Sequence, residues 1–470
     1  MQDVRDVVVV SNRGPLSFRT GDDGTPVRAG TGGGLAATLH PLLRGTGATW
    51  VAAAMSEADR RAAALGLMRD EGLRVVSVEP DVAAYDMAYN VVSNATLWFC
   101  HHHLWDLPRR PRFDRRWREA WDAYREVNRD FAEAVAEQAP EGARVLVQDY
   151  HLSLVGATLA GLRPDLRTSH FSHTPFADPG ILRTLPSYAA GELLSGLAGF
   201  GACGFHSARW EASFRGAFDD PALLADASVK AAPATYVAPL GPHPESLEAE
   251  AASDEVADAR RRLEELYGAR RLIVRVDRVE LSKNILRGLW AFDELLATRP
   301  SWRGAVTMLT LAYPSREALA EYLAYRAEVE HTVEVVNERW GTAGWTPVVL
   351  GVADDRARSM AALSAYDVLL VNPVRDGLNL VAKEGPLVNR AEGVLVLSRE
   401  AGAWDELRPA AVGVNPFDVS QTAAALDTAL SMDPAERAAR AAQLKKIVLA
   451  QTAADWLDRQ LEVAAGIRVA

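Results

Sequence analysis

Short apolar runs alternate with long amphipathic segments along this chain, and this alternation limits the available folds more than any other feature. The runs typical of buried strands are VVVV (7–10), ARVLVQ (143–148), TSHFSH (168–173), LIVRV (272–276), GAVTMLTL (304–311), TPVVLG (346–351), DVLLV (367–371), GVLVLS (393–398) and AVGVN (411–415). Amphipathic segments of helical character separate them, as at 113–137 and 315–338. Strands that alternate with helices pair in parallel and carry helices on both faces of the sheet. The sequence therefore predicts an α/β protein with doubly wound, Rossmann-like parallel sheets.

The chain is long enough for two domains. With 470 residues, of which 49% are hydrophobic, it can build two cores of ordinary size. Prolines and a glycine interrupt the pattern at APLGPHPESL (238–247), which is typical of a linker. We therefore expect one domain over residues 1–240 and a second over 241–452. The final helices, 434–450 and 453–466, are expected to fold back across the first domain, with 453–470 packing on it.

Composition and charge exclude several classes of protein. The net charge of −11 disfavours a general role in binding nucleic acids or membrane surfaces, so an anionic ligand must meet locally clustered Arg and Lys. Cys100 and Cys203 are too few for a disulfide framework, which favours a reducing compartment. The amino terminus lacks the pattern of a signal peptide, and no apolar stretch approaches the roughly 20 residues of a membrane span. We expect a cytoplasmic protein.

A basic pair follows one of the predicted strands. Arg278 and Lys283 stand in RVDRVELSK (275–283), after the run LIVRV. The carboxyl ends of strands are where open α/β sheets bind ligands. The planar fork of Arg and the compact charge of Lys could together hold a diphosphate. Taken alone, however, two solvated surface cations are the more common explanation.

A second polar segment follows the predicted strand at 366–373. The turn DG and the predicted helix LNLVAKEGPLVN (378–389) come next, so Asp376 lies at the turn and Glu384 two turns into the helix. A helix amino terminus suits phosphate, and the two carboxylates could accept hydrogen bonds from sugar and ribose hydroxyls. The alternative is a helix cap and an exposed glutamate.

The first half of the chain carries two glycine-containing segments. SNRGPLSF (11–18) follows the opening strand, and a polar, flexible turn is expected before GTGGGLAATL (30–39). Such a glycine cluster lets backbone N–H groups approach a phosphate or a sugar. It matches neither a P-loop nor G-x-G-x-x-G, and a plain surface loop remains open.

Aromatic and histidine residues concentrate in YNVVSNATLWFCHHHLWDL (89–107). Tyr89 and Trp98 could contact a carbohydrate, although such rings are more often part of the core. The run 101–103 consists of three histidines, which in an extended segment would point to opposite faces without a Cys or acidic partner. We therefore expect no metal site there.

Two further strand ends carry polar side chains. Asp149 in VQDYHLSL could orient an acceptor hydroxyl, and His173 in SHFSHTPFADP could hydrogen-bond a sugar. Either could instead be a satisfied structural group, which for a lone histidine is more common than a catalytic role. No serine stands in a G-x-S-x-G elbow, which excludes the α/β-hydrolase type of site.

These motifs occur together and in order. SNRGPL, GGGL, YNVVSNATLW, VQDYHL, HTPF, RVDRVELSK, NPVRDGLNLVAKE, VLVLSREAGAWDEL and VNPFD resemble the trehalose-6-phosphate synthases of glycosyltransferase family 20, across roughly residues 7–430. The resemblance implies the GT-B fold, two Rossmann-like domains with parallel sheets facing an interdomain cleft, with an acceptor domain first and a nucleotide-sugar donor domain second. It also implies retaining transfer of glucose from a nucleotide diphosphate glucose to glucose 6-phosphate, giving α,α-trehalose 6-phosphate.

The resemblance assigns residues to the donor. Arg278 and Lys283 match the pair that holds the diphosphate, Glu384 matches the ribose ligand, and His173 matches the histidine at the donor glucose. The remaining donor positions are Gly34, which matches the glycine that closes over the donor, and Asp376 with backbone groups of Leu378, Asn379 and Leu380. Of these, Arg278, Lys283, Asp376 and His173 are the residues expected at the reacting groups.

The resemblance also assigns the acceptor side. Arg13 and Arg316 match the arginines that bind the 6-phosphate, Tyr89 and Trp98 line the pocket, and Asp149 meets a sugar hydroxyl. No protein nucleophile or general base is expected, because a front-face displacement leaves the diphosphate to accept the proton. Catalysis would then consist of positioning and charge stabilisation. No cofactor and no metal are expected, the partners are small-molecule substrates, and a homo-oligomer is left open.

The chain departs from the family pattern at Ala53, where a second tryptophan is frequent, at Leu378, where methionine is frequent, and at Asn284, where glycine is common. Asn284 is shared with relatives that couple cyclitols, so a pseudo-glycosyltransferase is one alternative. A catalytically inactive sensor of glucose 6-phosphate is another.

Two acidic residues bear on the donor base. Asp354 and Asp355 lie in VADDRARS (352–359), which matches the region contacting the base. A carboxylate can accept two hydrogen bonds from the edge of guanine but only one from uracil. We therefore hypothesise that GDP-glucose is preferred and UDP-glucose comes next, unless these residues only cap a helix.

Overall fold

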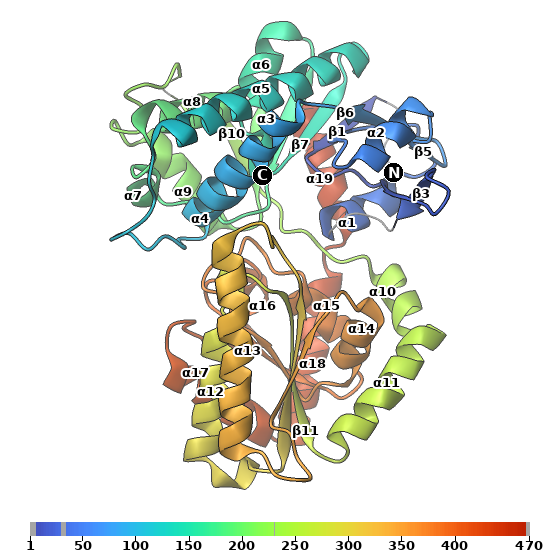
Figure 1. Ribbon diagram of the computed structural model, residues 1–470, viewed down its shortest axis with the longest axis vertical. Helices are drawn as coiled ribbons and strands as arrows, with labels where there is room; N and C mark the ends of the chain where they lie inside the picture. The colour runs from blue at the N-terminus through green and yellow to red at the C-terminus, as the bar shows by residue number, and fades with distance from the viewer. Residues whose placement is uncertain (1–5, 30–33, 230, 467–470) are drawn as a thin grey trace. The chain divides into compact units, whose positions relative to one another are not determined.

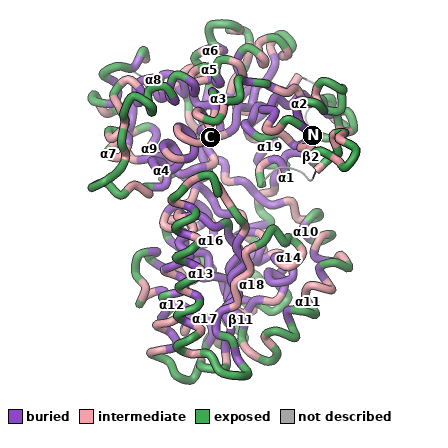
Figure 2. The backbone as a smooth tube through the Cα atoms, viewed as in Figure 1, coloured by how far each residue is buried: buried purple, intermediate pink, exposed green. Residues whose placement is uncertain are grey.

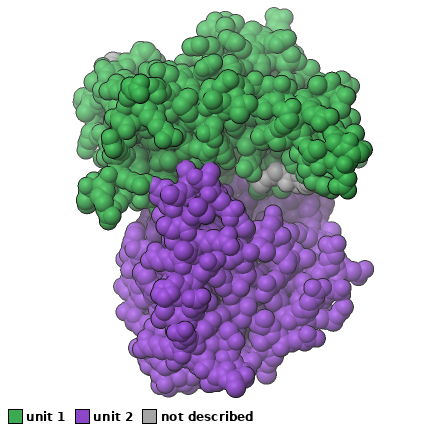
Figure 3. Space-filling model, viewed as in Figure 1, with its two compact units in different colours: residues 1–239, 453–470 green, residues 240–452 purple. Residues whose placement is uncertain are grey.

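The chain divides into two compact units (Figures 1 and 3). The computed structural model describes residues 6–29, 34–229 and 231–466. Unit 1 comprises residues 1–239 and 453–470, and unit 2 comprises residues 240–452. No helix among the described residues is long and apolar enough to cross a membrane.

The described part of unit 1 is built on an eight-stranded sheet with the order β10-β9-β8-β7-β1-β4-β6-β5. Every neighbouring pair is parallel except β5 and β6. The strands are β1 (Val7–Ser11), β4 (Thr49–Ala53), β5 (Arg69–Asp70), β6 (Leu73–Val78), β7 (Arg144–Gln148), β8 (Arg167–Ser172), β9 (Ala202–Phe205) and β10 (Ala234–Val237). The predicted strands at 7–10, 143–148 and 168–173 correspond to β1, β7 and β8.

Helices cover this sheet on both faces (Figure 1). On one face α5 (Arg115–Gln138), α6 (Val155–Leu162) and α8 (Ser187–Ala198) pack in series, and on the other α1 (Gly34–Leu43) packs against α19 (Ala453–Ala464). The other helical segments are α2 (Glu57–Ala64), α3 (Val82–Asp86), η1 (Met87–Leu97), α4 (Trp98–His101), η2 (Tyr150–Leu152), α7 (Pro179–Leu182) and α9 (Ala208–Phe218). The amphipathic pattern at 113–137 thus corresponds to α5, whose aromatic and aliphatic side chains are buried.

The segment after the opening strand differs from the expected flexible turn. Strands β2 (Ser17–Thr20) and β3 (Pro26–Ala29) pair in antiparallel register as a hairpin. The Gly21 amide donates to the Thr25 carbonyl at 2.8 Å, which closes the turn. The expectation was wrong because the segment is polar on both strands and therefore lacks the apolar run of a buried strand.

The described part of unit 2 contains a six-stranded parallel sheet with the order β13-β12-β11-β14-β15-β16. The strands are β11 (Arg271–Arg278), β12 (Val306–Tyr313), β13 (Val348–Val352), β14 (Val368–Val371), β15 (Val394–Ser398) and β16 (Val412–Val414). All six were predicted, because each contains an apolar run. β12, β14 and β15 are almost entirely buried and β11 is buried except at its two ends, whereas the edge strands β13 and β16 are mostly half-buried. Figure 2 shows most of these strands as buried backbone.

Two groups of helices enclose the sheet of unit 2. The first comprises α12 (Ile285–Thr298), α13 (Ala320–Trp340) and α17 (Val419–Ser431), and its apolar side chains join those of the strands in one core. The second comprises α10 (Pro244–Ala251), α11 (Asp254–Tyr267), α14 (Arg356–Ala365), α15 (Val381–Val388), α16 (Trp404–Leu407) and α18 (Pro434–Leu449). Two short turns, η3 (Leu281–Lys283) and η4 (Pro300–Trp302), complete the unit.

The two final helices belong to different units. Helix α19 packs on β7, β8 and β9 of unit 1, whereas α18 packs on α15 and α16 of unit 2. The expectation that 434–450 also folds across the first domain was wrong. Arg437 explains the difference, since its buried side chain binds Asp367 at 3.2 Å and the carbonyl of Ala391 at 3.0 Å.

The strand order reverses once in each doubly wound sheet. In unit 1 the chain proceeds outward from β1 to β4 and β6, then returns to β7 on the other side of β1. In unit 2 it proceeds from β11 to β12 and β13, then returns to β14 on the other side of β11. Ligands of open α/β sheets bind at such reversals, outside the carboxyl ends of the strands. The two reversals therefore mark where a site is expected.

Candidate functional site

A lysine and an aspartate meet at the reversal in unit 2. Lys283 follows β11 and Asp376 follows β14, and Lys283 Nζ lies 2.5 Å from Asp376 Oδ2. Each side chain is only 13% exposed. Burial lowers the pKa of Lys283, but the carboxylates of Asp376 and Asp277 outweigh it and hold that pKa above its usual value. Lys283 is therefore a mostly buried, charged ammonium and not a solvated surface cation.

A buried polar network fixes the turn that carries Lys283. The guanidinium of Arg275 is fully buried, pairs with Asp277 and donates to the Lys283 carbonyl at 2.6 Å. Asn284 adopts a left-handed backbone with φ of 59°. Its amide nitrogen donates to the carbonyls of Asn372 at 2.9 Å and Pro416 at 2.7 Å. The turn after β11 is thereby tied to the segment after β14.

Two arginines converge on a glutamate that the sequence did not single out. Glu280 is fully buried, and its Oε1 lies 3.0 Å from Arg278 Nη1 and 2.5 Å from Arg316 Nη1. The Ser315 hydroxyl donates to the same oxygen at 2.8 Å. The structure therefore places Arg278, Lys283, Arg316 and Asp376 at the carboxyl edge of one sheet.

The helix after β14 starts later than predicted. Helix α15 begins at Val381, not 378, because Asn379 has a positive φ of 76° that a helix cannot contain. Asn379 Nδ2 instead donates to Asp376 Oδ2 at 3.2 Å, and the Leu378 amide approaches Asp376 Oδ1 at 3.4 Å. Leu380 precedes the first helical residue. Glu384 consequently lies in the first turn of α15, where a negative charge suits the helix dipole.

Glu384 and the acidic pair at 354–355 lie on neighbouring elements. Arg356 binds Glu250 through two hydrogen bonds of 2.8 and 3.0 Å and lies 3.5 Å from Glu384. Burial raises the pKa of Glu384, and Arg356 partly opposes this. Asp355 Oδ1 accepts the Arg358 amide at 2.9 Å and caps α14, so the helix-cap explanation holds for Asp355. Asp354 is exposed.

In unit 1, Arg13 follows β1 and lies near an aromatic row. Arg13 Nη2 is 3.5 Å from the Tyr89 hydroxyl. The distance between ring centroids is 5.7 Å for Tyr89 and His151 and 4.1 Å for His151 and Tyr150. It is 5.9 Å for Tyr150 and Trp98. The structure thus connects Tyr89 and Trp98 through two intervening rings. Ala53, at the end of β4, is buried.

The histidine run is helical at its start, which corrects the expected extended segment. His101 ends α4, and His102 Nδ1 lies 2.9 Å from the Trp98 carbonyl. His101 Nδ1 accepts the Ala177 amide at 3.1 Å. Both rings are buried core groups, and within the described ranges no three His, Cys, Asp or Glu side chains are grouped to hold a metal. The prediction failed because residues 87–97 form a π-helix, η1, that continues directly into α4.

Asp149 and His173 meet at the carboxyl ends of β7 and β8. The His173 amide donates to Asp149 Oδ1 at 3.2 Å, and Asp149 has a positive φ of 72°. His173 Nε2 lies 2.9 Å from Gln148 Oε1, whose amide nitrogen donates to Gln460 Oε1 of α19 at 3.1 Å. His173 Nδ1 lies 3.1 Å from His206 Nε2.

This chain of hydrogen bonds corresponds to one tautomer of His173. With the Gln148 nitrogen directed to Gln460 and its oxygen to His173, the proton of the ring is on Nε2. Nδ1 then accepts from His206. Burial lowers the pKa of His173 to about 3, so the ring is neutral near pH 7.

The glycine segment is only partly described. Gly34 is exposed and begins α1, and its carbonyl accepts the Thr38 hydroxyl at 2.7 Å. Residues 30–33 lie outside the described residues, so the expected approach of their backbone amides to a phosphate or a sugar stays a prediction.

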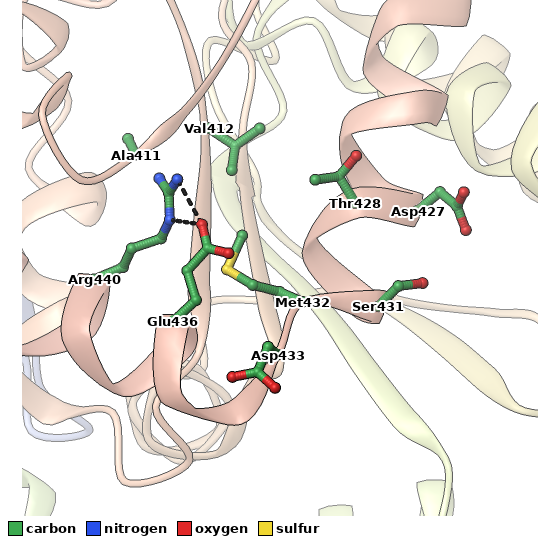
Figure 4. A pocket seen from close by; sticks show the side chains of 9 residues that line it. All are labelled: Ala411, Val412, Asp427, Thr428, Ser431, Met432, Asp433, Glu436 and Arg440. Atoms are coloured by element: carbon green, nitrogen blue, oxygen red, sulfur yellow. Dashed lines mark hydrogen bonds and ion pairs between the residues drawn. The ribbon is translucent and has the colours of Figure 1, made fainter.

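A separate cavity of about 590 Å³ lies in unit 2 (Figure 4). It is lined by the amino-terminal end of β16, the end of α17 and the start of α18. Its acidic groups are committed to local structure: Asp427 binds Arg299 and Trp302, Asp433 caps α18, and Glu436 pairs with Arg440. It lies at the opposite sheet edge from Lys283 and does not gather ligand-binding groups.

Comparisons with known proteins agree with this arrangement. A family model for glycosyltransferase family 20 matches residues 5–465. A trehalose-6-phosphate synthase of Mycobacterium sp. (strain JLS) is 34% identical over 493 residues, covering 99% of this chain and 97% of the relative.

Solved structures agree as well. A UDP-forming α,α-trehalose-phosphate synthase from Burkholderia xenovorans in complex with glucose 6-phosphate is 27% identical, with a TM-score of 0.84 over 98% of this chain and 100% of that one. An E. coli protein bound with UDP-2-fluoro glucose is 28% identical, with a TM-score of 0.83 over 98% and 99%. The chain therefore belongs to glycosyltransferase family 20 and is a retaining glycosyltransferase with the GT-B fold.

Proposed function

We propose that this protein is an α,α-trehalose-6-phosphate synthase, which transfers glucose from a nucleotide diphosphate glucose to glucose 6-phosphate with retention of configuration. The observation that carries the proposal is the position of Arg278 and Lys283 at the strand reversal of unit 2, where Lys283 pairs with Asp376. Cations at that edge suit a sugar nucleotide diphosphate. The named relatives, with their glucose 6-phosphate and UDP-2-fluoro glucose complexes, support the same substrates.

Each site residue has a role in this proposal. Arg278 and Lys283 hold the donor diphosphate, Asp376 and the backbone of 378–380 hold its sugar, and Glu384 binds the ribose. Gly34 closes over the donor. Arg13 and Arg316 bind the 6-phosphate of the acceptor, with the sugar against Tyr89, Trp98 and Asp149. His173 hydrogen-bonds the donor glucose.

The proposed reaction uses positioning and charge stabilisation. The diphosphate leaves as negative charge develops on it, and the two cations stabilise that charge in a partly buried setting. The neutral state of His173 argues against its use as an acid near pH 7, because its pKa lies far below. The departing diphosphate accepts the proton of the acceptor hydroxyl on the same face. We propose that no metal or cofactor takes part, since Arg278 and Lys283 neutralise the diphosphate.

The preferred donor is proposed to be GDP-glucose, with UDP-glucose next. Asp354 is the residue on which this depends, because Asp355 uses Oδ1 to cap α14. Asp354 is exposed after β13, and a carboxylate there can accept the N1–H and the 2-amino group of guanine.

A donor series tests both proposals. The protein is incubated with glucose 6-phosphate and GDP-, UDP- or ADP-glucose, with and without EDTA, and nucleotide release is followed. We expect fastest release from GDP-glucose, no effect of EDTA, and a roughly 10-fold loss for GDP-glucose alone in Asp354→Ala, as expected from about 1.4 kcal/mol of lost hydrogen bonding. Asp354→Asn is the matched control for charge. Faster use of UDP-glucose by the wild type would reject the guanine preference and leave the synthase proposal intact.

The substrates bear on where the protein acts. Nucleotide sugars and sugar phosphates are small soluble metabolites, and Cys100 and Cys203 are buried cysteines that form no disulfide. We therefore propose that the enzyme works in the cytoplasm, where thiols stay reduced.

A further inference from the structure

A single buried carboxylate lies between two arginines that come from different parts of the chain. Glu280 is the second residue after β11, and Ser315 and Arg316 follow β12. Arg278 Nη1, Arg316 Nη1 and the Ser315 hydroxyl all contact the same atom, Glu280 Oε1. Glu280 Oε2 is buried and has no hydrogen-bond donor among the described residues.

Glu280 is charged despite its burial. Burial alone would raise its pKa, but Arg278, Arg316 and Lys283 lower that pKa to about 2. A buried carboxylate is costly unless cations compensate it, and replacing such a group by an apolar one is often neutral or stabilising. Stability therefore gives no sufficient reason for a carboxylate at this position.

The arginines differ in how far they depend on Glu280. The Arg278 side chain is 48% exposed. Without its contact with Glu280, it would be solvated and would sample many conformations. Arg316 is 11% exposed and has a positive φ of 46°, a conformation that long side chains rarely adopt. The Tyr322 hydroxyl lies 3.3 Å from its Nη1. Backbone strain of this kind persists where the surroundings hold it, often at functional sites.

We propose that Glu280 is a positioning residue that orients the two phosphate-binding arginines together, so that one carboxylate prepares the protein for both a nucleoside diphosphate and a sugar monophosphate. The inference rests on the proposed function, which assigns Arg278 to the donor and Arg316 to the acceptor. A guanidinium carries five N–H donors, so each arginine can keep its Nη1 contact with Glu280 and present its other donors to a phosphate. Glu280 itself touches neither ligand.

Two substitutions separate the charge of Glu280 from its length. Glu280→Gln keeps the length and removes the charge. Glu280→Asp keeps the charge but shortens the side chain by one methylene, so one oxygen can no longer reach both guanidinium groups. Arg278→Lys and Arg316→Lys are the matched controls, because each keeps its charge and loses the planar fork of one arginine.

The experiment measures binding of GDP and of glucose 6-phosphate separately, by calorimetry, to the full-length wild type and the four variants. We expect Glu280→Gln to weaken the binding of both ligands about 10-fold, since the loss of a hydrogen bond to a charged group lowers affinity by roughly this factor. Arg278→Lys should weaken mainly GDP, and Arg316→Lys mainly glucose 6-phosphate. In turnover, KM for both substrates should rise in Glu280→Gln, and kcat should fall as well, because Arg278 also stabilises the charge that develops on the departing diphosphate.

A double substitution adds an internal check. Glu280→Gln combined with Arg316→Lys should bind glucose 6-phosphate no more weakly than Arg316→Lys alone, because the two changes remove one shared interaction. If Glu280→Gln does not fold, Glu280→Asp carries the test, with a loss for at least one ligand expected.

Several outcomes would overturn the inference. Unchanged affinity for both ligands in folded Glu280→Gln or Glu280→Asp would do so, as would full additivity with Arg316→Lys. Wild-type protein that binds GDP and glucose 6-phosphate but forms no trehalose 6-phosphate would reject the proposed function alone, and the binding data would still decide the role of Glu280. Wild-type protein that binds neither ligand would reject both.

Discussion

At the scale of single residues, Asn284 shows how a departure from a family pattern can have a structural cause. Its backbone φ of 59° lies in a region that glycine adopts freely and asparagine tolerates, so the glycine of the expected family pattern would fit the same backbone. Its side chain binds the carbonyls of Asn372 and Pro416. These contacts give Asn284 a structural role that does not require a cyclitol substrate.

We predict that Asn284→Gly destabilises the protein by about 1–3 kcal/mol, the cost of leaving buried carbonyls unpaired. Asn284→Ala should lose about 1 kcal/mol more, because alanine is strained at positive φ. Urea unfolding measures both. A stable Asn284→Gly variant with a changed acceptor preference would instead assign Asn284 to acceptor recognition.

At the scale of secondary-structure elements, α19 connects the end of the chain to a site residue near its middle. Gln460 holds Gln148, and Gln148 holds His173. The Trp456 ring also lies 5.6 Å from the His173 ring. Helix α19 therefore contributes to the orientation of His173 in addition to covering the sheet of unit 1.

Replacing Gln460 tests this connection. In Gln460→Met the amide of Gln148 loses its acceptor and can turn, so we expect kcat/KM for the donor to fall about 10-fold. Gln460→Glu keeps an acceptor oxygen and should retain most of the activity. Initial rates at limiting donor concentration give the comparison. Equal losses in the two variants would mean that helix packing matters and the hydrogen-bond chain does not.

Apolar runs identified most strands from the sequence but not all of them. All six strands of unit 2 contain such a run and were predicted, whereas β4 (TWVAA) and β6 (LRVVSV) of unit 1 were missed despite theirs, and the short strands β9 (ACGF) and β10 (ATYV) were missed as well. The start of α13 was predicted at 315 but lies at Ala320, after the left-handed residue Arg316. The spacing of apolar residues along the sequence does not indicate a residue with a left-handed backbone.

The same limit applies to the site. The position of Arg278, Lys283 and Asp376 at one sheet edge was predictable, because each stands at or just after the end of a recognisable strand, and their roles in binding stay predictions. Glu280 was missed although it stands between two basic residues at a buried strand end, a signal that could have indicated a shared ion pair. Gln460 carried no local signal, because its contact with Gln148 spans 312 positions and depends on how α19 folds back within unit 1.

At the scale of the whole molecule, two buried neutral histidines make folding sensitive to acid. Burial lowers the pKa of His170 to about 4 and that of His173 to about 3, both below the usual 6.5. Between pH 6.5 and the lower folded-state pKa of each histidine, the imidazole is protonated in the unfolded chain and neutral in the folded chain. Their contribution to stability is therefore full above pH 6.5 and is lost as the pH falls toward 4 for His170 and toward 3 for His173.

We predict that the free energy of unfolding falls between pH 7 and pH 5, and that His170→Gln reduces this fall by about 1–2 kcal/mol. Glutamine can replace the N–H group that His170 directs to the Asp149 carbonyl at 3.1 Å. Urea unfolding at the two pH values provides the measurement. An identical fall in the variant would show that His170 is already protonated in the folded protein.

The central claim is that the protein joins two glucose units through their anomeric carbons with retention. Its most direct test is the NMR spectrum of the product that purified protein forms from a nucleotide diphosphate glucose and glucose 6-phosphate. We expect a 1,1-linked disaccharide with two α anomeric protons and one phosphate at C6, in equal amount to the released nucleoside diphosphate. A β linkage, or free glucose with glucose 6-phosphate left unconsumed, would contradict the account.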